Sequence, residues 1–299
     1  MKNTGRKISE IVITRLIQIA GYLSILYVAL ICLFLLREGL PALGDVSLKD
    51  LSGVRWYPIE GLFGILPLMY GSLIVTIAAA FIAVPLGIAT AVFISEVAPV
   101  KVNQFLKPII EILAGMPSVV LGFIGILVLV PFLRKFLVLP TGLTAFTGAL
   151  LLGWTAIPAI VSIAEDALNA VPRSLRDASL ALGATHWQTM WGVTVPAARS
   201  GILTAVMLGI GRVIGETMAV MMVTGNAPAL PRGLSAIFTP VRTMTATIAS
   251  EMGEVATGSS HYHVLFFIGI VLFVFSLIIN VTAFMISFRQ LRRSERLLS

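Results

Sequence analysis

The sequence predicts an all-α integral membrane protein with six transmembrane helices. Three observations support this fold class. Of 299 residues, 58% are hydrophobic, only 12% are charged, and apolar runs of about 20 residues or more recur along the chain. A composition so poor in charge excludes a soluble enzyme, and so much apolar side chain excludes a disordered chain. The single cysteine, Cys32, cannot form an intrachain disulfide.

The intervals that lack charged residues place the six helices. We expect them at residues 17–36, 71–94, 110–133, 142–164, 201–224 and 264–288. Only the fifth contains charges in its interior, Arg212 and Glu216. No cleavable signal peptide is expected, because the first apolar run begins after sixteen residues and is long enough to stay as an anchor.

The distribution of Lys and Arg predicts the orientation. Thirteen of them fall in the two terminal tails and the segments 95–108 and 165–199, against seven on the other side, so both termini are expected in the cytoplasm (N-in, C-in). The net charge of +7 does not indicate a nucleic-acid partner, because the basic residues cluster beside apolar runs and are not interleaved with aromatics. The partner predicted by this pattern is membrane lipid.

The second long outer segment, residues 225–263, has apolar residues at helical spacing. A short amphipathic or re-entrant helix is therefore expected there. The residues that carry the pattern are Leu234, Ile237, Phe238, Val241, Met244, Ile248 and Met252.

The cytoplasmic segment 171–196 predicts two short helices joined by a turn. A helix can begin after Pro172, Gly183 ends it, and Pro196 is expected to break a second helix before the fifth span. The unit exposes Trp187 and Trp191. These tryptophans suit either an interfacial belt or a docking surface for a soluble partner.

The same segment resembles the EAA loop of ABC-importer permeases, whose usual pattern is Glu-Ala-Ala, Gly, Ile and Leu-Pro. Here the pattern reads Asp177-Ala178-Ser179, Gly183, Val193 and Val195-Pro196 at matching spacing. Asp replaces Glu, Ser replaces Ala, and Val stands at both aliphatic positions. The resemblance implies coupling helices that seat in a groove of the ATP-hydrolysing subunit. It assigns this contact to Arg176, Asp177, Ala178, Ser179, Gly183, Ala184 and Pro196.

Further motifs narrow the resemblance to PstC-type permeases of bacterial phosphate ABC importers. They lie at residues 37–40, 63–71, 115–120, 209–220, 242–249 and 258–263, and the likeness runs from about residue 20 to about 290. It implies a permease for inorganic phosphate that works by alternating access in the bacterial cytoplasmic (inner) membrane. The implied partners are a PstA-type permease, an ATP-binding cassette ATPase dimer and an extracytoplasmic phosphate-binding protein.

The resemblance also divides the chain into three parts. Residues 1–62 comprise the N-terminal tail, the first span and an outer loop. Residues 63–290 form the permease domain, which includes the coupling loop 171–196. Residues 291–299 form a basic cytoplasmic tail.

Arg212 and Glu216 are the main candidates for the substrate pathway. They are four residues apart near the middle of the fifth span, so they are expected on one helical face, about 5–6 Å apart. A mid-membrane Arg costs roughly 2.5–3.5 kcal/mol on insertion scales, so it should face protein or water. The pair is either an ion pair that fixes helix packing or a phosphate contact, since a guanidinium fits phosphate oxygens. We assign Thr217 to the same pathway.

Arg242, with Thr243 and Thr245, is a second candidate in the outer segment. A cation beside hydroxyl groups suits an entrance to the pathway, and it equally suits a solvated loop. His261 and His263 alternate at an interface, but no third ligand is close in sequence, so no metal site is expected.

No catalytic residue and no cofactor is expected in this chain. It lacks the G-x-x-x-x-G-K-[ST] phosphate loop, so ATP and Mg²⁺ should bind to the partner ATPase. Two alternatives stay open: a permease of the same family for another oxyanion, and an ATP-independent secondary anion transporter or channel. Near the inner surface, Glu111 is expected to pair with Lys107, its i,i+4 neighbour.

Overall fold

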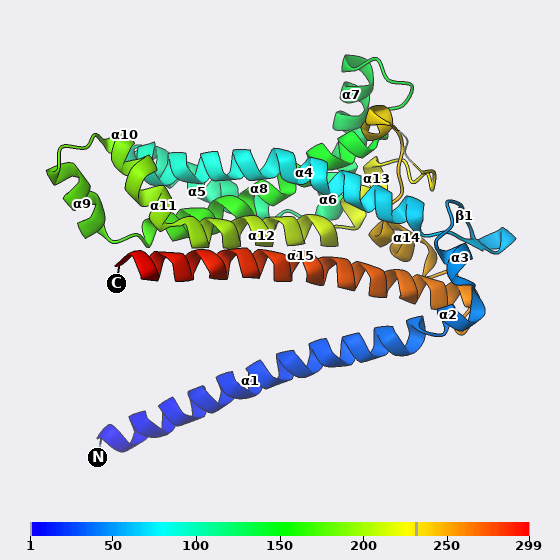
Figure 1. Ribbon diagram of the computed structural model, residues 1–299, viewed down its shortest axis with the longest axis horizontal. Helices are drawn as coiled ribbons and strands as arrows, with labels where there is room; N and C mark the ends of the chain where they lie inside the picture. Colours follow the sequence, from blue (N-terminus) through cyan, green and yellow to red (C-terminus); the bar gives the residue numbers. More distant parts are fainter. Residues whose placement is uncertain (1, 231–232, 299) are drawn as a thin grey trace.

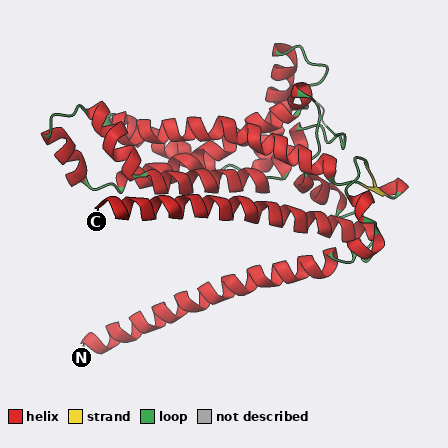
Figure 2. Ribbon diagram, viewed as in Figure 1, coloured by secondary structure: helices red, strands yellow, loops and turns green. Residues whose placement is uncertain are grey.

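The computed structural model describes residues 2–230 and 233–298, and most of these residues are helical (Figures 1 and 2). The long helices are α1 (Lys2–Gly39), α4 (Leu66–Val92), α5 (Val100–Gly115), α8 (Ala145–Asn169), α12 (Arg199–Gly215) and α15 (Ser260–Leu298). Shorter α-helices are α2 (Ala42–Asp45), α3 (Leu48–Leu51), α6 (Ser118–Ile124), α7 (Val130–Phe136), α9 (Arg173–Ala181), α10 (His186–Thr189), α11 (Val195–Ala197), α13 (Met218–Val223) and α14 (Met244–Glu251). Two 3-10 turns are η1 (Pro58–Glu60) and η5 (Leu234–Phe238), and three π-turns are η2 (Phe93–Val97), η3 (Gly125–Leu129) and η4 (Met190–Thr194). Strands β1 (Trp56–Tyr57) and β2 (Leu62–Phe63) pair antiparallel.

The described residues contain five helical segments that are long and apolar enough to cross a membrane, and a bent helix pair makes a sixth. The pair is 186–197 with 199–215, bent by 67°. The predicted all-α class with six spans is confirmed. Helices α1 and α15 extend well beyond the limits expected for the first and last spans.

Two spans that were expected to be continuous are broken, and those expectations are wrong. The expected helix 110–133 divides between α5 and α6 because Pro117 disfavours helical backbone at the preceding residue, and Met116 has ψ 133°. The expected helix 201–224 divides between α12 and α13, where Glu216 is extended with ψ 130°. The expected spans 110–133 and 201–224 therefore each contain a non-helical segment.

The core of the bundle lies between α4, α8 and α12, which run side by side (Figure 1). Ile160 of α8 is fully buried there. A Cβ atom on Gly87 of α4 would lie 2.7 Å from Ile160 Cγ2, and one on Gly209 of α12 would overlap Ile160 Cγ1. The two glycines allow the three backbones to approach around one isoleucine, as small residues do between membrane helices.

We expect Gly209→Ala to destabilise the purified chain by about 1–3 kcal/mol, because the added methyl group overpacks Ile160. Gly211→Ala, on the same helix, is the control, since a Cβ there meets no atom of the described structure within 4 Å. The measurement is the thermal midpoint of both variants in detergent. Equal midpoints would contradict this account of the core.

Helix α1 diverges from the bundle and touches α15 mainly near its own C-terminal end (Figure 1). Phe34 packs edge-to-face on Phe266 with ring centroids 5.4 Å apart, and Gly39 lies against Ile270. The termini lie at the same end of the molecule as α9 and α10, whereas α2, α3 and β1 lie at the other (Figure 1). We call these the inner end and the outer end, following the predicted orientation.

Cysteine labelling tests that orientation. In a Cys32→Ser background, we expect a cysteine at Ser47, before α3, to react with an impermeant maleimide only from outside the cell. A cysteine at Ser299, which lies outside the described residues, should react only from the cytoplasmic side. The reverse pattern would invert the assignment of the two ends.

The outer segment contains two short helical pieces instead of one helix. The 3-10 turn η5 and helix α14 both lie within the region of helical apolar spacing. The expectation of a short helix in residues 225–263 is therefore confirmed, with two helical pieces in place of one. Thr239 and Thr243 between them are extended, with ψ 154° and 160°.

Candidate functional site

The break between α12 and α13 brings polar groups from two segments together. The extended backbone at Glu216 frees its carbonyl oxygen from the helix, and this oxygen accepts a hydrogen bond from Thr245 Oγ1 at 3.1 Å. Carboxylate oxygen Oε1 of Glu216 accepts from the amide of Thr217 at 3.2 Å, and Thr217 Oγ1 donates to the carbonyl of Gly215 at 3.2 Å. The break is thus a hydrogen-bonded structure held by α14.

Arg212 links this break to the one between α5 and α6. It lies 13 residues after the start of α12, about 20 Å along the helix axis, and its side chain is exposed on the surface of the chain. Its Nη2 donates to the carbonyl oxygen of Ala114, in the last turn of α5, at 3.3 Å. A cation deep within a span is therefore fixed on a face that the described chain leaves uncovered.

The expectation that Arg212 and Glu216 lie on one face of a continuous helix is wrong. The helix ends at Gly215, so the i,i+4 geometry does not extend to Glu216. The structure gives the two side chains separate partners, the carbonyl of Ala114 and the amide of Thr217.

Thr243 and Thr245 are buried, at 4% and 7% exposure, and shape the start of α14. Thr243 is the N-cap residue, and its hydroxyl oxygen accepts from the amide of Ala246 at 3.2 Å. The two hydroxyl oxygens lie 3.2 Å apart. Together they position the α14 terminus against Glu216.

Arg242 belongs to a partly buried cluster at the outer end. Its Nη2 lies 2.8 Å from Glu251 Oε1 and donates to Ser250 Oγ at 2.7 Å. Glu251 also accepts from Trp56 Nε1 at 3.1 Å and contacts His261 Nε2 at 2.8 Å. With 15% of its side chain exposed, Arg242 is not a solvated loop residue, and that alternative is wrong. The cluster ties β1, α14 and α15 together.

The two histidines of the 261–263 motif bind different carboxylates. His261 contacts Glu251, and His263 Nδ1 lies 2.7 Å from Asp45 Oδ2 in α2. In the part of the chain that the structure describes, no group of three or more His, Cys, Asp or Glu side chains could hold a metal ion.

The cytoplasmic segment forms the expected helix-turn-helix at the inner end. Helix α9 ends before Gly183, whose φ of +86° is accessible mainly to glycine. Thr185 and Gln188 then form a capping box that starts α10. Pro196 does not end the second helix as expected: this helix runs without interruption from His186 through the π-turn η4 to Ala197, one residue beyond Pro196. The 67° bend lies between Ala197 and Arg199.

Some of the residues that match the EAA loop lie on the surface, and others are turned toward the interior. Asp177, Ala178 and Gly183 are exposed. Ser179 is half-buried, with its hydroxyl 3.0 Å from Thr189 Oγ1, and Ala184 is half-buried beside it. Arg176 points inward to Glu96 at 3.0 Å. The surface open to a partner is therefore α9 with the turn that follows it.

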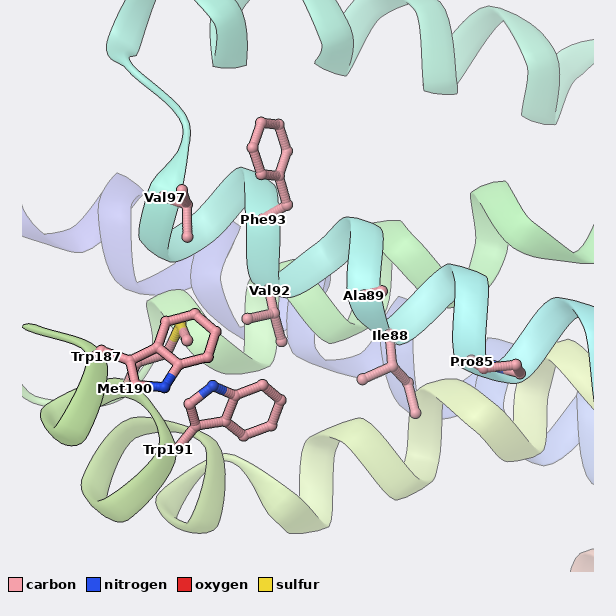
Figure 3. A pocket seen from close by; sticks show the side chains of 9 residues that line it. All are labelled: Pro85, Ile88, Ala89, Val92, Phe93, Val97, Trp187, Met190 and Trp191. Atoms are coloured by element: carbon pink, nitrogen blue, oxygen red, sulfur yellow. The ribbon is translucent and has the colours of Figure 1, made fainter.

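Trp187 and Trp191 line an apolar groove against α4 (Figure 3). Their ring centroids are 5.9 Å apart in an edge-to-face arrangement. The groove has a volume of about 460 Å³. Its other lining residues are Pro85, Ile88, Ala89, Val92, Phe93, Val97 and Met190. Both tryptophans remain exposed, and Trp187 also lines a second pocket with Arg173, Arg176 and Asp177 of α9.

Sequence reasoning missed a polar network beneath α9. Lys107 pairs with Glu165 at 3.4 Å, not with Glu111 as expected, and Glu165 is only 4% exposed. Ser95 donates to Asn169 at 3.0 Å. These partners are 58 and 74 positions apart, so no local spacing could have indicated them.

Together, the six-span helical fold, the helix breaks within two spans and the loop at the inner end define a transport permease that crosses the membrane several times. Residues 83–292 match the family described as "Binding-protein-dependent transport system inner membrane component". The chain belongs to this family. It is a multi-pass protein of the cytoplasmic membrane and a permease subunit of an ABC importer, a class that works with an ATPase and a binding protein.

Curated relatives support the same family. The chain is 43% identical over 251 residues to the "Probable ABC transporter permease protein YqgH" of Bacillus subtilis, which covers 82% of this chain and 80% of the relative. It is 35% identical over 257 residues to the phosphate transport system permease protein PstC of Mesorhizobium japonicum, covering 80% and 77%.

A solved structure supports the fold. A chain of a bacterial alginate ABC transporter, in complex with an alginate-bound periplasmic protein, aligns with a TM-score of 0.62 and 15% identity. The alignment covers 95% of this chain and 96% of that one. The likeness places α1 to α15 in the type I importer permease fold.

Proposed function

We propose that this chain is a permease subunit that carries inorganic phosphate across the cytoplasmic membrane by alternating access. The observation that carries the proposal is the exposed Arg212 guanidinium within a span, fixed between two helix breaks. Phosphate near neutral pH has a charge of about −1.5 to −2, and a guanidinium matches its oxygens. Relatives named as phosphate permeases, at 31–35% identity, support the choice of substrate.

Glu216 and Thr217 complete the proposed substrate contact. An ionised carboxylate accepts hydrogen bonds but cannot donate them, so Glu216 can accept from a protonated phosphate oxygen and repels fully deprotonated sulfate. Its Oε1 already takes the amide of Thr217, which leaves Oε2 for the anion. Thr243 and Thr245 act through the position of the break, and Arg242 acts by holding α14 to the outer cluster.

The uncovered face around Arg212 supports a second permease as partner. An Arg exposed to lipid at this depth costs roughly 2.5–3.5 kcal/mol, so the face should meet protein or a water-filled pathway. We assign this place to a PstA-type permease, with lipid around both subunits. Residues 63–290 form the permease domain in this proposal, and residues 291–299 form a basic tail.

ATP-driven import requires further subunits. We assign ATP and Mg²⁺ to an ATPase dimer that docks on Asp177, Ala178 and the Gly183 turn, with no catalytic residue or cofactor in this chain. Ala184, half-buried directly after the turn, and Pro196, exposed in α11, belong to the same docking unit. An extracytoplasmic phosphate-binding protein delivers the anion at the outer end.

Reconstitution tests the proposal. Proteoliposomes containing both permeases, the ATPase dimer and the binding protein should import labelled phosphate only with ATP, and excess sulfate should not compete. Import by this chain alone without ATP would favour a secondary transporter or channel. Equal competition by sulfate would favour a permease for another oxyanion.

A further inference from the structure

Helix α9 is attached to the rest of the chain by very few groups. All nine of its residues are described, and none of them is buried. Ser179 contacts Thr189 in the second half of the loop, and Arg176 makes an ion pair and a hydrogen bond to the bundle itself. Arg176 therefore supplies an ionic contact that holds α9 against the spans.

Arg176 joins three elements at one point. Its Nη2 lies 3.0 Å from Glu96 Oε1, in the π-turn that ends α4, and donates at 2.8 Å to the carbonyl of Leu168, in the last turn of α8. The side chains of Arg176 and Glu96 are 24% and 11% exposed. The Leu168 carbonyl also accepts from the amide of Val171 at 3.2 Å, and the dipole of α8 favours a cation at this C-terminal end of the helix.

The elements that Arg176 contacts, the π-turn η2 and the end of α8, are themselves held by polar contacts. Asn103 donates to the carbonyl of Ile94 in the π-turn at 3.3 Å. Ser95 donates to Asn169 of α8 at 3.0 Å, and Lys107 of α5 pairs with Glu165 of α8 at 3.4 Å. The inner ends of α4, α5 and α8 are thus cross-linked by polar contacts.

We propose that Arg176 and Glu96, with the Leu168 carbonyl, form an ionic clasp that transmits the movement of α9 to the inner ends of α4 and α8. This proposal rests on the proposed function, in which α9 docks on an ATPase. Arg176 and Glu96 are positioning residues in it. They contact neither ATP nor substrate. When α9 is displaced, the contact between them displaces the inner ends of α4 and α8 with it.

Removing one charge of the clasp tests the proposal in the reconstituted complex. We expect Glu96→Gln and Arg176→Gln to keep normal recovery of the ATPase but to lower the phosphate imported per ATP hydrolysed at least about fivefold, the lower end of typical coupling effects. Arg176→Lys should retain coupling, because a single nitrogen, Nη2, makes both contacts and an ammonium has three donors.

The control is Asp166→Asn, which removes an exposed carboxylate at the same end of α8 and should change nothing. A normal transport ratio in Glu96→Gln would overturn the clasp. Loss of the ATPase from the Glu96→Gln complex would also overturn it, since the pair would then shape the docking surface and not transmit movement.

A spectroscopic measurement tests the clasp without any transported anion. Spin labels at Ala181 of α9 and Lys101 of α5, both exposed, in a Cys32→Ser background report the distance across the clasp. With the clasp intact, the distance distribution should stay narrow and unchanged by ATP, whereas Glu96→Gln should broaden it and make it depend on nucleotide. Identical distributions would reject the clasp, even if the complex proves to carry an anion other than phosphate.

Discussion

Replacing Arg212 with alanine is expected to lower phosphate import on the order of 100-fold while the complex still assembles. The loss corresponds to about 3 kcal/mol, within the range for removing one partner of a hydrogen-bonded charge pair. Assembly should persist because the side chain makes one protein contact, to the Ala114 carbonyl, and is otherwise exposed on the described chain. Labelled phosphate uptake and recovery of the complex are measured together.

Two further variants sharpen this result. Glu216→Gln should keep uptake but weaken the discrimination against sulfate, because a neutral amide no longer repels it and can donate. Arg55→Ala, an exposed arginine at the outer end, is the control and should leave uptake unchanged. Failure of Arg212→Ala to assemble, together with full activity of the exchanged pair Arg212→Glu and Glu216→Arg, would reject the substrate role.

Replacing Gly183 with valine is expected to separate the permease from its ATPase. At φ +86° a β-branched side chain costs about 1–3 kcal/mol, so the turn between α9 and α10 should rearrange. A Cβ there meets no atom within 4 Å, so the effect comes from backbone strain and not from a clash. We expect recovery of the ATPase, and ATP-driven uptake with it, to fall at least about fivefold.

Gly192→Val is the matched control for this prediction. Gly192 lies in the π-turn η4 of the same loop, a Cβ there also meets nothing within 4 Å, and its φ is not positive. Protease accessibility should show that both variants insert in the membrane. Normal ATPase recovery in Gly183→Val would contradict the coupling role of the turn.

Much of the architecture follows from the sequence alone. Composition and run length determine the spans around α1, α4, α8 and α15, because a bilayer leaves an apolar segment of about 20 residues few alternatives to a helix. The turn at Gly183 is also local, since a left-handed backbone selects glycine. The spacing of a few residues from Asp177 to Pro196 is enough to show the resemblance of the loop 171–196 to the EAA loop.

The tertiary structure alone decided how the polar groups are paired. Arg212 meets the Ala114 carbonyl 98 positions away, and Trp56 meets Glu251 across 195 positions. The break at Glu216 is stable because Thr245, 29 positions later, satisfies the freed carbonyl. Hydrophobic periodicity specifies which face of a helix is buried but not which distant donor arrives at it. In a membrane interior without water, a span can contain a non-helical residue only where such a donor satisfies the carbonyl oxygen that leaves the helix.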